Sequence, residues 1–361
     1  MFPQDIIFEE SPDEAIETVN NADIIHLHNY IDLDTRDFSP IDFKALQRSG
    51  KAILRQFRTA PGTLAKRTGV PAEKIISPDL PSIVIAQYPE RYYPHALVVP
   101  NAVPSEDNEY KPKDINPDYD ICFSPSNMTY AWSSRWDTKG APETIQMLKE
   151  VKKKAHSKNV IVSGKPLHDV LEKKQKSKIV IDDLVTGSYH ASGLEGLCLS
   201  KAVVCYLDNR IVKVLKEISR TDEIPFVNSH LAHSKEVLVD LLNHRDTVKS
   251  IGELSRKWID TYWSEKILAE RYVGIYKELL ENPDRIRRQE SLRIDGPTRQ
   301  YFQITLHDLI YDAQKKEYKK TVTLKRKLKK YFKKIAMSLR RTLRDKTPES
   351  LANQYRKLKS S

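Results

Sequence analysis

The chain has 361 residues, of which 39% are hydrophobic, so it can bury sizeable cores and is not a wholly disordered protein. Its net charge of +11 is concentrated at one end, because residues 315–361 contain 18 lysines and arginines but three acidic residues. Residues 1–314 are therefore slightly acidic. The charge predicts an anionic partner for the tail and does not identify a ligand for the rest.

Three cysteines lie in apolar stretches, without the spacing of a metal site or a redox pair: Cys122, Cys198 and Cys205. We expect them to be reduced core residues. The first residues lack the basic and apolar regions of a secretory signal, and no run of about eighteen apolar residues predicts a membrane span. The sequence thus predicts a cytoplasmic protein.

In the first third of the chain, short apolar runs alternate with helical patterns. The predicted strands are at 5–10, 23–28, 51–57, 82–87 and 96–101. The predicted helices are at 12–22, with Ser11 as N-cap and Pro12 in the first turn, and at 40–50. A polar, proline-rich stretch at 104–117 is typical of a linker.

After this linker the alternation begins again. The predicted strands are at 119–124, 159–164, 178–183, 202–207 and 224–227. The predicted helices are near 141–155, 167–176, 193–200 and 209–219, and residues 234–282 are helical throughout. Such alternation predicts an α/β fold with two Rossmann-like parallel sheets. We expect one lobe at 1–110, a second at 111–283 and a tail at 284–361.

The loop after the predicted strand 119–124 carries two cations. Arg135 and Lys139 lie just before a helix that starts near Pro142, and cations beside a helix N-terminus favour an anion site. A solvated surface loop is the alternative. Trp136, between the two cations, could stack on a base or a sugar.

The loop after the predicted strand 178–183 is rich in glycine. Gly187 and Gly193 allow close approach to the backbone, and Ser192 could cap a helix that starts at Gly193. Glu195 would lie in the first turn, where the helix dipole favours it. It could also accept two hydroxyl hydrogen bonds, as from a ribose. The pattern predicts a pocket for a nucleoside diphosphate.

Several other polar residues have two interpretations. His190 is either a catalytic candidate or a packed loop histidine. Asp182 and Asp183 are adjacent in a strand and should point to opposite faces, so we expect one of them to cap a helix or loop. His26 and His28 could bind a metal, but no third ligand is near in sequence, so we favour a cleft-lining role for His28.

Five motifs together resemble the GT-B glycosyltransferases, in particular the retaining family with a glycogen-synthase-like C-terminal lobe. The resemblance covers residues 5–280. In chain order the motifs are ADIIHLHNY (22–30), VVPNAV (98–103), SRWDTKG (134–140), SGLEGLCLSKAVVCY (192–206) and WSEKILAERYVGIYKELLEN (263–282). The resemblance implies two lobes that face a cleft, with an abbreviated first lobe and a closing helix that crosses back to it.

The resemblance also implies the roles of individual residues. The donor is a nucleoside-diphosphate sugar, and neither a cofactor nor a metal is needed, because cations stabilise the leaving diphosphate. The implied catalytic residues are Arg135 and Lys139, and His190 is a further catalytic candidate because of its position beside Gly187 and Ser188. The implied donor-binding residues are Ser126, Gly187, Ser188, Gly193, Leu194 and Glu195. The implied acceptor-side residues are His28, Asn29 and Arg58.

Two positions depart from the family pattern. Gly187 stands where the family has its first glutamate, and Arg58 stands where it has a catalytic histidine. These departures motivate a third hypothesis, a non-catalytic nucleotide-sugar-binding protein. The leading hypothesis is a glycosyltransferase of cell-surface or lipid-linked glycan synthesis, and the second is a glycosyltransferase that modifies nucleic acid.

The tail has the pattern of a basic amphipathic helix. Within 323–346, large apolar residues recur at helical spacing: Leu324, Leu328, Tyr331, Phe332, Ile335, Leu339 and Leu343. Lysines and arginines fill the other face. We favour binding of residues 318–346 to an anionic membrane surface, on its inner face, over binding to nucleic acid or packing as a solvated helix.

Overall fold

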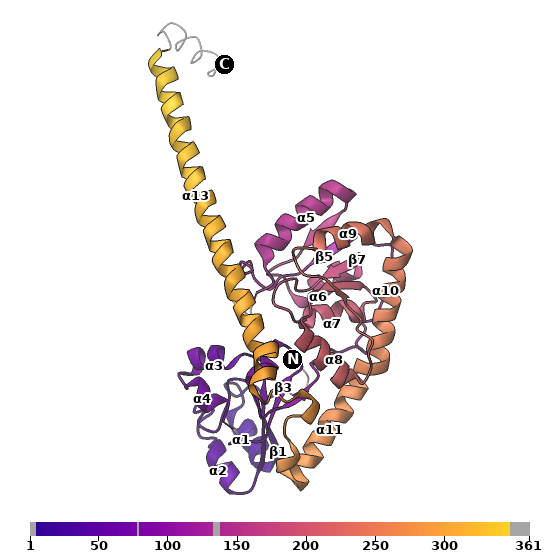
Figure 1. The fold of residues 1–361 in the computed structure, drawn as a ribbon. Helices are drawn as coiled ribbons and strands as arrows, with labels where there is room; N and C mark the ends of the chain where they lie inside the picture. Colours follow the sequence, from indigo (N-terminus) through magenta and orange to yellow (C-terminus); the bar gives the residue numbers. More distant parts are fainter. Residues whose placement is uncertain (1–4, 78, 133–137, 347–361) are drawn as a thin grey trace. The chain divides into compact units, whose positions relative to one another are not determined.

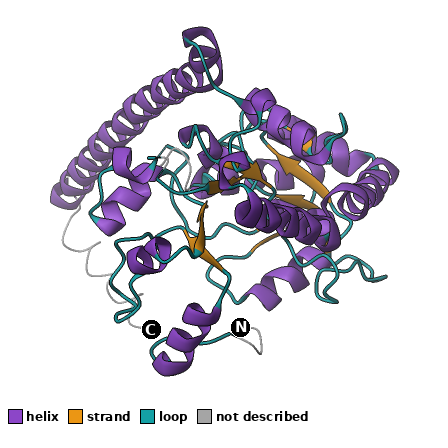
Figure 2. Cartoon of the chain, turned by 90° about the horizontal axis from the view of Figure 1, so that it is seen from below, coloured by secondary structure: helices purple, strands orange, loops and turns teal. Residues whose placement is uncertain are grey.

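The structure is a computed structural model that describes residues 5–77, 79–132 and 138–346. It forms two compact units, Met1–Ile304 and Thr305–Ser361. The first unit contains two parallel sheets, and the second is built on one long helix (Figure 1). In the first unit the strands lie among helices (Figure 2), which is the layered arrangement of an α/β fold.

The first sheet has four parallel strands in the order β1-β2-β3-β4. They are β1 (Ile24–His28), β2 (Ala52–Phe57), β3 (Ser82–Ile85) and β4 (Leu97–Val99). The helices of this lobe are α1 (Pro12–Asn21), α2 (Phe43–Arg48), α3 (Pro61–Thr68) and α4 (Ala72–Ile75). Because a parallel sheet is covered on both faces, its strands are apolar on both sides.

Strand β2 shows how the two faces are used. Leu54 packs against Leu279 of α11 (Glu265–Glu281), and the Gln56 amide donates to Tyr272 Oη of the same helix at 3.0 Å. Ile53, on the opposite face, packs in a separate apolar cluster. Helix α11 follows the second sheet in sequence and covers the first, so the predicted crossing back to the first lobe is confirmed (Figure 1).

The second sheet has five parallel strands in the order β6-β5-β7-β8-β9. They are β5 (Tyr119–Phe123), β6 (Asn159–Ile161), β7 (Ser177–Ile181), β8 (Ala202–Cys205) and β9 (Val227–Asn228). The connecting helices are α5 (Ala141–Ala155), α6 (Leu167–Gln175), α7 (Ala191–Cys198) and α8 (Asn209–Ser219). The chain leaves β5 towards β6 and returns to β7 on its other side. Open α/β sheets bind their ligands at such a switch point.

The predicted fold class is confirmed, since both sheets are parallel and both alternate with helices. One predicted strand is wrong. Residues 5–10 contain a turn, in which the Glu10 and Ser11 amides donate to the Ile7 carbonyl at 3.0 and 2.9 Å. This turn directs the chain into α1. Ser11 is the N-cap residue of α1, as predicted, but its side chain makes no capping hydrogen bond.

The predicted helical stretch 234–282 is confirmed. It consists of α9 (Ser234–Asn243), α10 (Arg245–Trp258), a π-helical turn (Ile259–Trp263) and α11. The three cysteines are buried and free, as expected of core residues. Burial raises the pKa of Cys122 to about 11, so its thiol is unreactive at neutral pH.

A group of buried charges joins the two lobes. We call it the junction cluster, and its members are Glu90, Arg91, Asp208, Arg210 and Arg288. Arg210 Nε and Nη2 donate to the Glu90 carboxylate at 2.6 and 2.7 Å, and Arg288 pairs with the same carboxylate. Arg91 Nη2 lies 3.0 Å from Asp208 Oδ2. Glu90 follows β3 and Arg210 follows β8, so the carboxyl ends of the two sheets face each other.

The second unit contains α13 (Leu306–Lys346). The helix predicted at 323–346 is confirmed, as part of this longer helix. Between residues 323 and 335, its described large apolar side chains are exposed: Leu324, Leu328, Tyr331, Phe332 and Ile335. The side chains of Leu339 and Leu343 lie outside the described ones.

Among the described residues, no helix combines the length and the apolar character that crossing a membrane requires.

Candidate active site

The candidate site lies at the carboxyl ends of β5 and β7, on either side of the switch point. The loop after β5 leads to Lys139, and the loop after β7 leads through residues 182–190 to α7. Gly193 is in the first turn of α7. A Cβ atom at this position would lie 2.6 Å from Asp182 Oδ2, so only glycine lets the carboxylate approach the helix this closely.

Lys139 is the cation of this site within the described residues of its loop. Its Nζ lies 2.6 Å from Asp182 Oδ1, and it is only 7% exposed, so the alternative of a solvated surface lysine is wrong. Burial alone would raise the pKa of Asp182, but Lys139 and His190 hold that pKa below its ordinary value. Lys139 and Asp182 are therefore a buried ion pair. Arg135 and Trp136 lie outside the described residues.

Glu195 also has a buried partner. Lys174 of α6 pairs with the Glu195 carboxylate and donates to Ser192 O at 3.0 Å and to Ser192 Oγ at 2.8 Å. The Lys174 side chain is fully buried, whereas Glu195 is 13% exposed. We call Lys139, Lys174, Asp182 and Glu195 the donor-side cluster. Lys174 fixes the position of a carboxylate that still reaches solvent.

Neither Lys174 nor the role of Ser192 was predicted. In the sequence Lys174 belongs to the run EKKQK, which is typical of a solvated helix face. Ser192 does not cap a helix at Gly193: the helix starts at Ala191 with His190 as N-cap, and the Ser192 hydroxyl bonds to Lys174 and to Ser124 Oγ at 3.0 Å. A lysine at this spacing carries no sequence signal, because its partner is 21 residues away.

His190 lies between two buried carboxylates. Its backbone amide donates to Asp182 Oδ2 at 2.6 Å, and its Nδ1 is 3.5 Å from Asp183 Oδ2 and 3.9 Å from Asp182 Oδ1. The expectation that the two aspartates point to opposite faces is wrong, because β7 ends at Ile181 and strand alternation does not continue beyond it. Both carboxylates thus approach one imidazole.

Asp183 also shapes the turn that follows. Its Oδ1 accepts from the Val185 and Thr186 amides at 2.7 and 3.0 Å, which confirms that one of the aspartates caps a loop. Burial raises the pKa of Asp183, in contrast to that of Asp182. The loop therefore contains two adjacent carboxyl groups whose pKa values shift in opposite directions.

The remaining predicted donor-binding residues lie in different environments. Gly187 has φ +85°, and its carbonyl accepts from the Asp208 amide at 3.0 Å. Ser188 is buried and its hydroxyl accepts from the Tyr88 amide of the first lobe at 3.1 Å. Leu194 belongs to the hydrophobic core, and Ser126 is exposed in the loop after β5.

The acceptor-side residues meet at the carboxyl ends of β1 and β2. Asn29 Nδ2 donates to Thr59 Oγ1 at 3.2 Å, and its Oδ1 accepts from the Arg58 amide at 3.1 Å. His28 and Arg58 are exposed beside it. Although the side chain reaches solvent, partial burial of the ring and the charge of Arg58 lower the pKa of His28, so this imidazole is neutral at pH 7.

His26 lies below His28 on the face of β1 that α11 covers. The two rings stack with centroids 4.3 Å apart, and His26 Nδ1 lies 2.8 Å from Tyr276 Oη. Burial, together with the neighbouring His28 and Arg58, lowers the pKa of His26 to about 4. Among the described residues, no group of three metal-ligating side chains includes these histidines.

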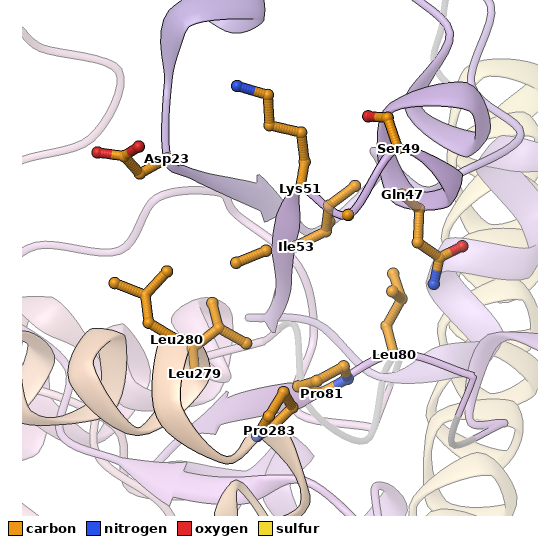
Figure 3. A pocket seen from close by; sticks show the side chains of 12 residues that line it. Asp23, Gln47, Ser49, Lys51, Ile53, Leu80, Pro81, Leu279, Leu280 and Pro283 are labelled. Atoms are coloured by element: carbon orange, nitrogen blue, oxygen red, sulfur yellow. The ribbon is translucent and has the colours of Figure 1, made fainter.

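A cavity of about 640 Å³ lies at the opposite edge of the first sheet, at the amino ends of its strands. Leu279 and Leu280 of α11 line one side of it, and Gln47 and Ser49 line the other (Figure 3). Its lysine, Lys51, donates to the Asn20 and Ala22 carbonyls at 2.6 and 2.7 Å and thereby caps the end of α1.

No family model and no curated protein matches the chain. Similar solved structures include a glycosyltransferase from Rickettsia africae, with 16% identity and a TM-score of 0.46 over 78% of this chain and 84% of that one. Sucrose-phosphate synthase from Thermosynechococcus elongatus has 11% identity and a TM-score of 0.48 over 78% and 81%. A variant of S. aureus TarM, crystallised with UDP and alpha-GlcNAc-glycerol, has 12% identity and a TM-score of 0.41 over 66% and 58%.

These solved structures are glycosyltransferases of the GT-B type, the type that the sequence motifs resemble. Two parallel-sheet lobes whose carboxyl ends face each other form a GT-B fold. At these identities and TM-scores the similarity supports no function, which must be argued from the residues of this chain.

Proposed function

We propose that the chain is a metal-independent glycosyltransferase that moves a sugar from a nucleoside-diphosphate sugar to an acceptor. The observation that carries this proposal is the donor-side cluster. Its cation, Lys139, follows β5, and its partly exposed carboxylate, Glu195, belongs to helix α7 that follows β7, on either side of the switch point. Open α/β sheets bind nucleotides at such a point.

Each charge has a role in sugar transfer. When the bond between the sugar and the diphosphate breaks, negative charge develops on the diphosphate, and a fixed ammonium group stabilises it. Lys139 supplies that group, together with Arg135 of the same loop. Glu195 accepts hydrogen bonds from the ribose hydroxyls, and Lys174 holds it in place. No divalent ion is needed where lysine and arginine compensate the leaving group.

The acceptor occupies the first-lobe edge formed by His28, Asn29 and Arg58. This edge carries an exposed imidazole and an exposed guanidinium, both suited to hydrogen bonds with hydroxyl or acidic groups of a glycan. It follows β1 and β2, whose carboxyl ends face the second lobe. Retention of configuration at the transferred sugar is what the sequence resemblance implies.

Turnover of a panel of UDP-, GDP- and ADP-sugars tests the proposal. We expect hydrolysis or transfer from one of them, in EDTA as well as without it, and at least a tenfold loss in Glu195→Ala. Glu172→Ala is the matched control, because Glu172 forms surface pairs, with Lys176 at 2.7 Å and with Lys173 at 3.9 Å. An absolute need for a divalent ion would overturn metal independence. Absence of turnover with every donor would overturn the enzymatic proposal.

A non-catalytic nucleotide-sugar-binding protein is the second candidate. The observation that favours it is the pairing of both key charges, Lys139 with Asp182 and Glu195 with Lys174. In addition, Gly187 supplies no carboxylate to the sugar. Binding of a nucleotide sugar without hydrolysis or transfer, in the presence of varied glycan and lipid-linked acceptors, would support this candidate.

We also propose that α13 binds an anionic membrane surface, which would place the enzyme at the inner face of a membrane beside a lipid-linked acceptor. The motive is the exposure of large apolar side chains on a lysine-rich helix: Phe332 is 64% exposed and Leu328 is 46% exposed. Apolar insertion together with charge attraction is how interfacial helices bind.

Vesicle binding tests this part. Full-length protein should bind vesicles that contain phosphatidylserine, and salt should release it. Changing Leu328, Phe332 and Ile335 to serine keeps the charge and should weaken binding at least tenfold. Tighter binding of the unmodified protein to DNA than to vesicles at equal salt would favour the nucleic-acid hypothesis instead.

A further inference from the structure

The first lobe contains a small charged cavity beside the acceptor edge. It has a volume of about 160 Å³ and lies on the face of β2 opposite to α11, where Arg55 and Phe57 project. We call it the Arg55 pocket. Its charged lining consists of Asp32, Asp34, Lys44, Arg55, Lys74 and Asp79.

Arg55 is the most buried of these charges, with 9% of its surface exposed. Its nearest carboxylate oxygen, Asp32 Oδ2, is 3.9 Å from Nη2, and its nearest hydrogen-bond acceptor is the Asn29 carbonyl at 3.5 Å. Among the described residues, Arg55 Nε has no hydrogen-bond partner. A buried guanidinium group is costly to leave in this state.

The arginines of the junction cluster all have a carboxylate partner within 3.0 Å, although Nε of Arg91 and of Arg288 also lacks a hydrogen-bond partner among the described residues. Arg210 donates from both Nε and Nη2 to the two oxygens of Glu90, at 2.6 and 2.7 Å. Such a fork-like pair is the preferred geometry of a guanidinium with a carboxylate. Arg55 presents the same two nitrogens without this partner. Burial therefore lowers the pKa of Arg55, and Asp32 and Tyr93 oppose the shift only in part.

The carboxylates around Arg55 are already engaged. Asp34 pairs with both Lys44 and Lys74. Asp32 Oδ1 accepts from the Asp34 amide at 2.9 Å and from Thr35 Oγ1 at 3.2 Å, and Asp79 accepts from Ser77 Oγ at 3.0 Å. Asp32 Oδ2 faces Arg55 Nη2 in a long ion pair of 3.9 Å, so the described part of the pocket offers Arg55 no carboxylate in the two-bond fork geometry.

We propose that the Arg55 pocket binds a small oxyanion group, a carboxylate or a phosphate, through the Nε and Nη2 edge of Arg55. The oxyanion would complete the fork that Glu90 provides for Arg210. Lys44 and Lys74, which share one aspartate, supply further positive charge at the pocket wall.

The pocket also indicates the class of acceptor, an assignment that depends on the proposed function. Asn29, whose carbonyl lies closest to Arg55, is one of the acceptor-side residues. An acceptor that contacts this edge can therefore place an acidic group on Arg55. We infer an acidic glycan, with either a uronic acid or a phosphodiester next to the hydroxyl that receives the sugar.

Titration with glucuronate, inorganic phosphate and glucose, without any nucleotide, tests the pocket. The readout is the NMR signal of Arg55 Nε–H in the full chain, at constant ionic strength. We expect glucuronate or phosphate to shift it and glucose to leave it unchanged. A shift with glucuronate alone would indicate a carboxylate, and one with phosphate alone a phosphodiester. No shift with either anion would overturn the proposal.

Variants provide an independent arm. Arg55→Met removes the charge but keeps the length of the side chain, and it should lower anion affinity about ten- to a hundredfold, as expected for loss of charged hydrogen bonds. Arg67→Met is the matched control, since Arg67 stacks on Tyr30 at 3.9 Å in the same lobe and should not affect affinity. Equal affinity in the Arg55 variant and the unmodified chain would overturn the proposal. The assay contains no donor, so its result is independent of the donor site.

Discussion

The junction cluster and the donor-side cluster consist of the same kinds of ion pair but have different roles. Both consist of lysine or arginine paired with buried carboxylates. In the junction cluster, Glu90 and Arg210 are completely buried and each carboxylate oxygen has a guanidinium partner. In the donor-side cluster, Glu195 is 13% exposed and the adjacent His190 is 21% exposed. The Lys139–Asp182 pair of the donor-side cluster is nearly as buried as the junction pairs, at 7% and 0% exposure. The junction pairs hold the lobes together, whereas Glu195 still reaches solvent and can meet a ligand.

This difference matters because an ion pair is not stabilising in itself. Removing two charges from water costs about as much as their attraction returns, but removing one partner of a buried pair is strongly destabilising. The junction cluster should therefore dominate stability. The donor-side cluster should dominate binding, with a smaller effect on folding.

The largest expected effect is that of Glu90→Gln. This change leaves Arg210 and Arg288 buried without a counter-ion, so the free energy of unfolding should fall by about 3–5 kcal/mol. Urea unfolding measures it. The control is Glu290→Gln, whose exposed pair with Arg293 should contribute less than about 1 kcal/mol. If Glu90→Gln and Glu290→Gln lowered the free energy of unfolding equally, the claim that the buried junction pairs dominate stability would be contradicted.

The same variant has a predicted pH dependence. Burial alone would raise the pKa of Glu90, but Arg210 and Arg288 hold it below its ordinary value. A depressed carboxyl pKa contributes stability above the pKa of the unfolded chain, about 4.3, and loses it as the pH falls through the folded pKa. The difference between the unmodified chain and Glu90→Gln should thus persist down to about pH 4 and shrink below it. A difference that vanished between pH 7 and 5 would contradict this.

The next effect is that of Lys174→Met. It should lower the free energy of unfolding by about 1–3 kcal/mol, less than Glu90→Gln, because the remaining Glu195 carboxylate still reaches water. A positioning role adds a second readout. The unmodified chain should bind a nucleoside diphosphate more tightly than its 2′-deoxy form, and Lys174→Met should reduce that preference. If Lys174→Met left the preference for the ribose form unchanged, Lys174 would have a structural role only.

The smallest effect concerns His26, which belongs to neither cluster. Because burial lowers its pKa to about 4, folding favours the neutral ring, and the resulting stability is lost as the pH falls from about 6.5 to 4. The loss is about 2 kcal/mol, since each pKa unit corresponds to about 1.4 kcal/mol and the ring is partly exposed. His26→Phe should flatten this part of the pH profile. Replacing the exposed His244 should not.

The sequence predicts the elements of this protein better than their partnerships. Helices α5 and α8 and both sheets follow from local patterns, and the glycine-rich loop singles out Gly193 and Glu195. The predicted first-turn position of Glu195 is wrong, because α7 starts at Ala191 and Glu195 is its fifth residue. The pairs Glu90–Arg210 and Glu90–Arg288 join residues 120 and 198 positions apart. No local propensity encodes such a contact, since only the packing of two lobes brings the side chains together.

The aspartates after β7 illustrate the same limit at short range. Strand alternation would place Asp182 and Asp183 on opposite faces. However, β7 ends at Ile181, before both aspartates, and both carboxylates approach His190. Element ends are the least predictable feature of a sequence. Here the end of the strand determines which groups share the site.

Calorimetric titration of UDP, GDP and ADP into the unmodified chain, Lys139→Met and Lys178→Met tests the central claim most directly. Lys178 is the matched control, because it pairs with Asp120 at 2.7 Å near the start of β7, away from the switch point. We predict that one nucleoside diphosphate binds the unmodified chain and the Lys178 variant alike, and binds Lys139→Met about ten- to a hundredfold more weakly. Equal binding by the Lys139 variant, or no binding of any of the three by the unmodified chain, would contradict a donor site at the switch point.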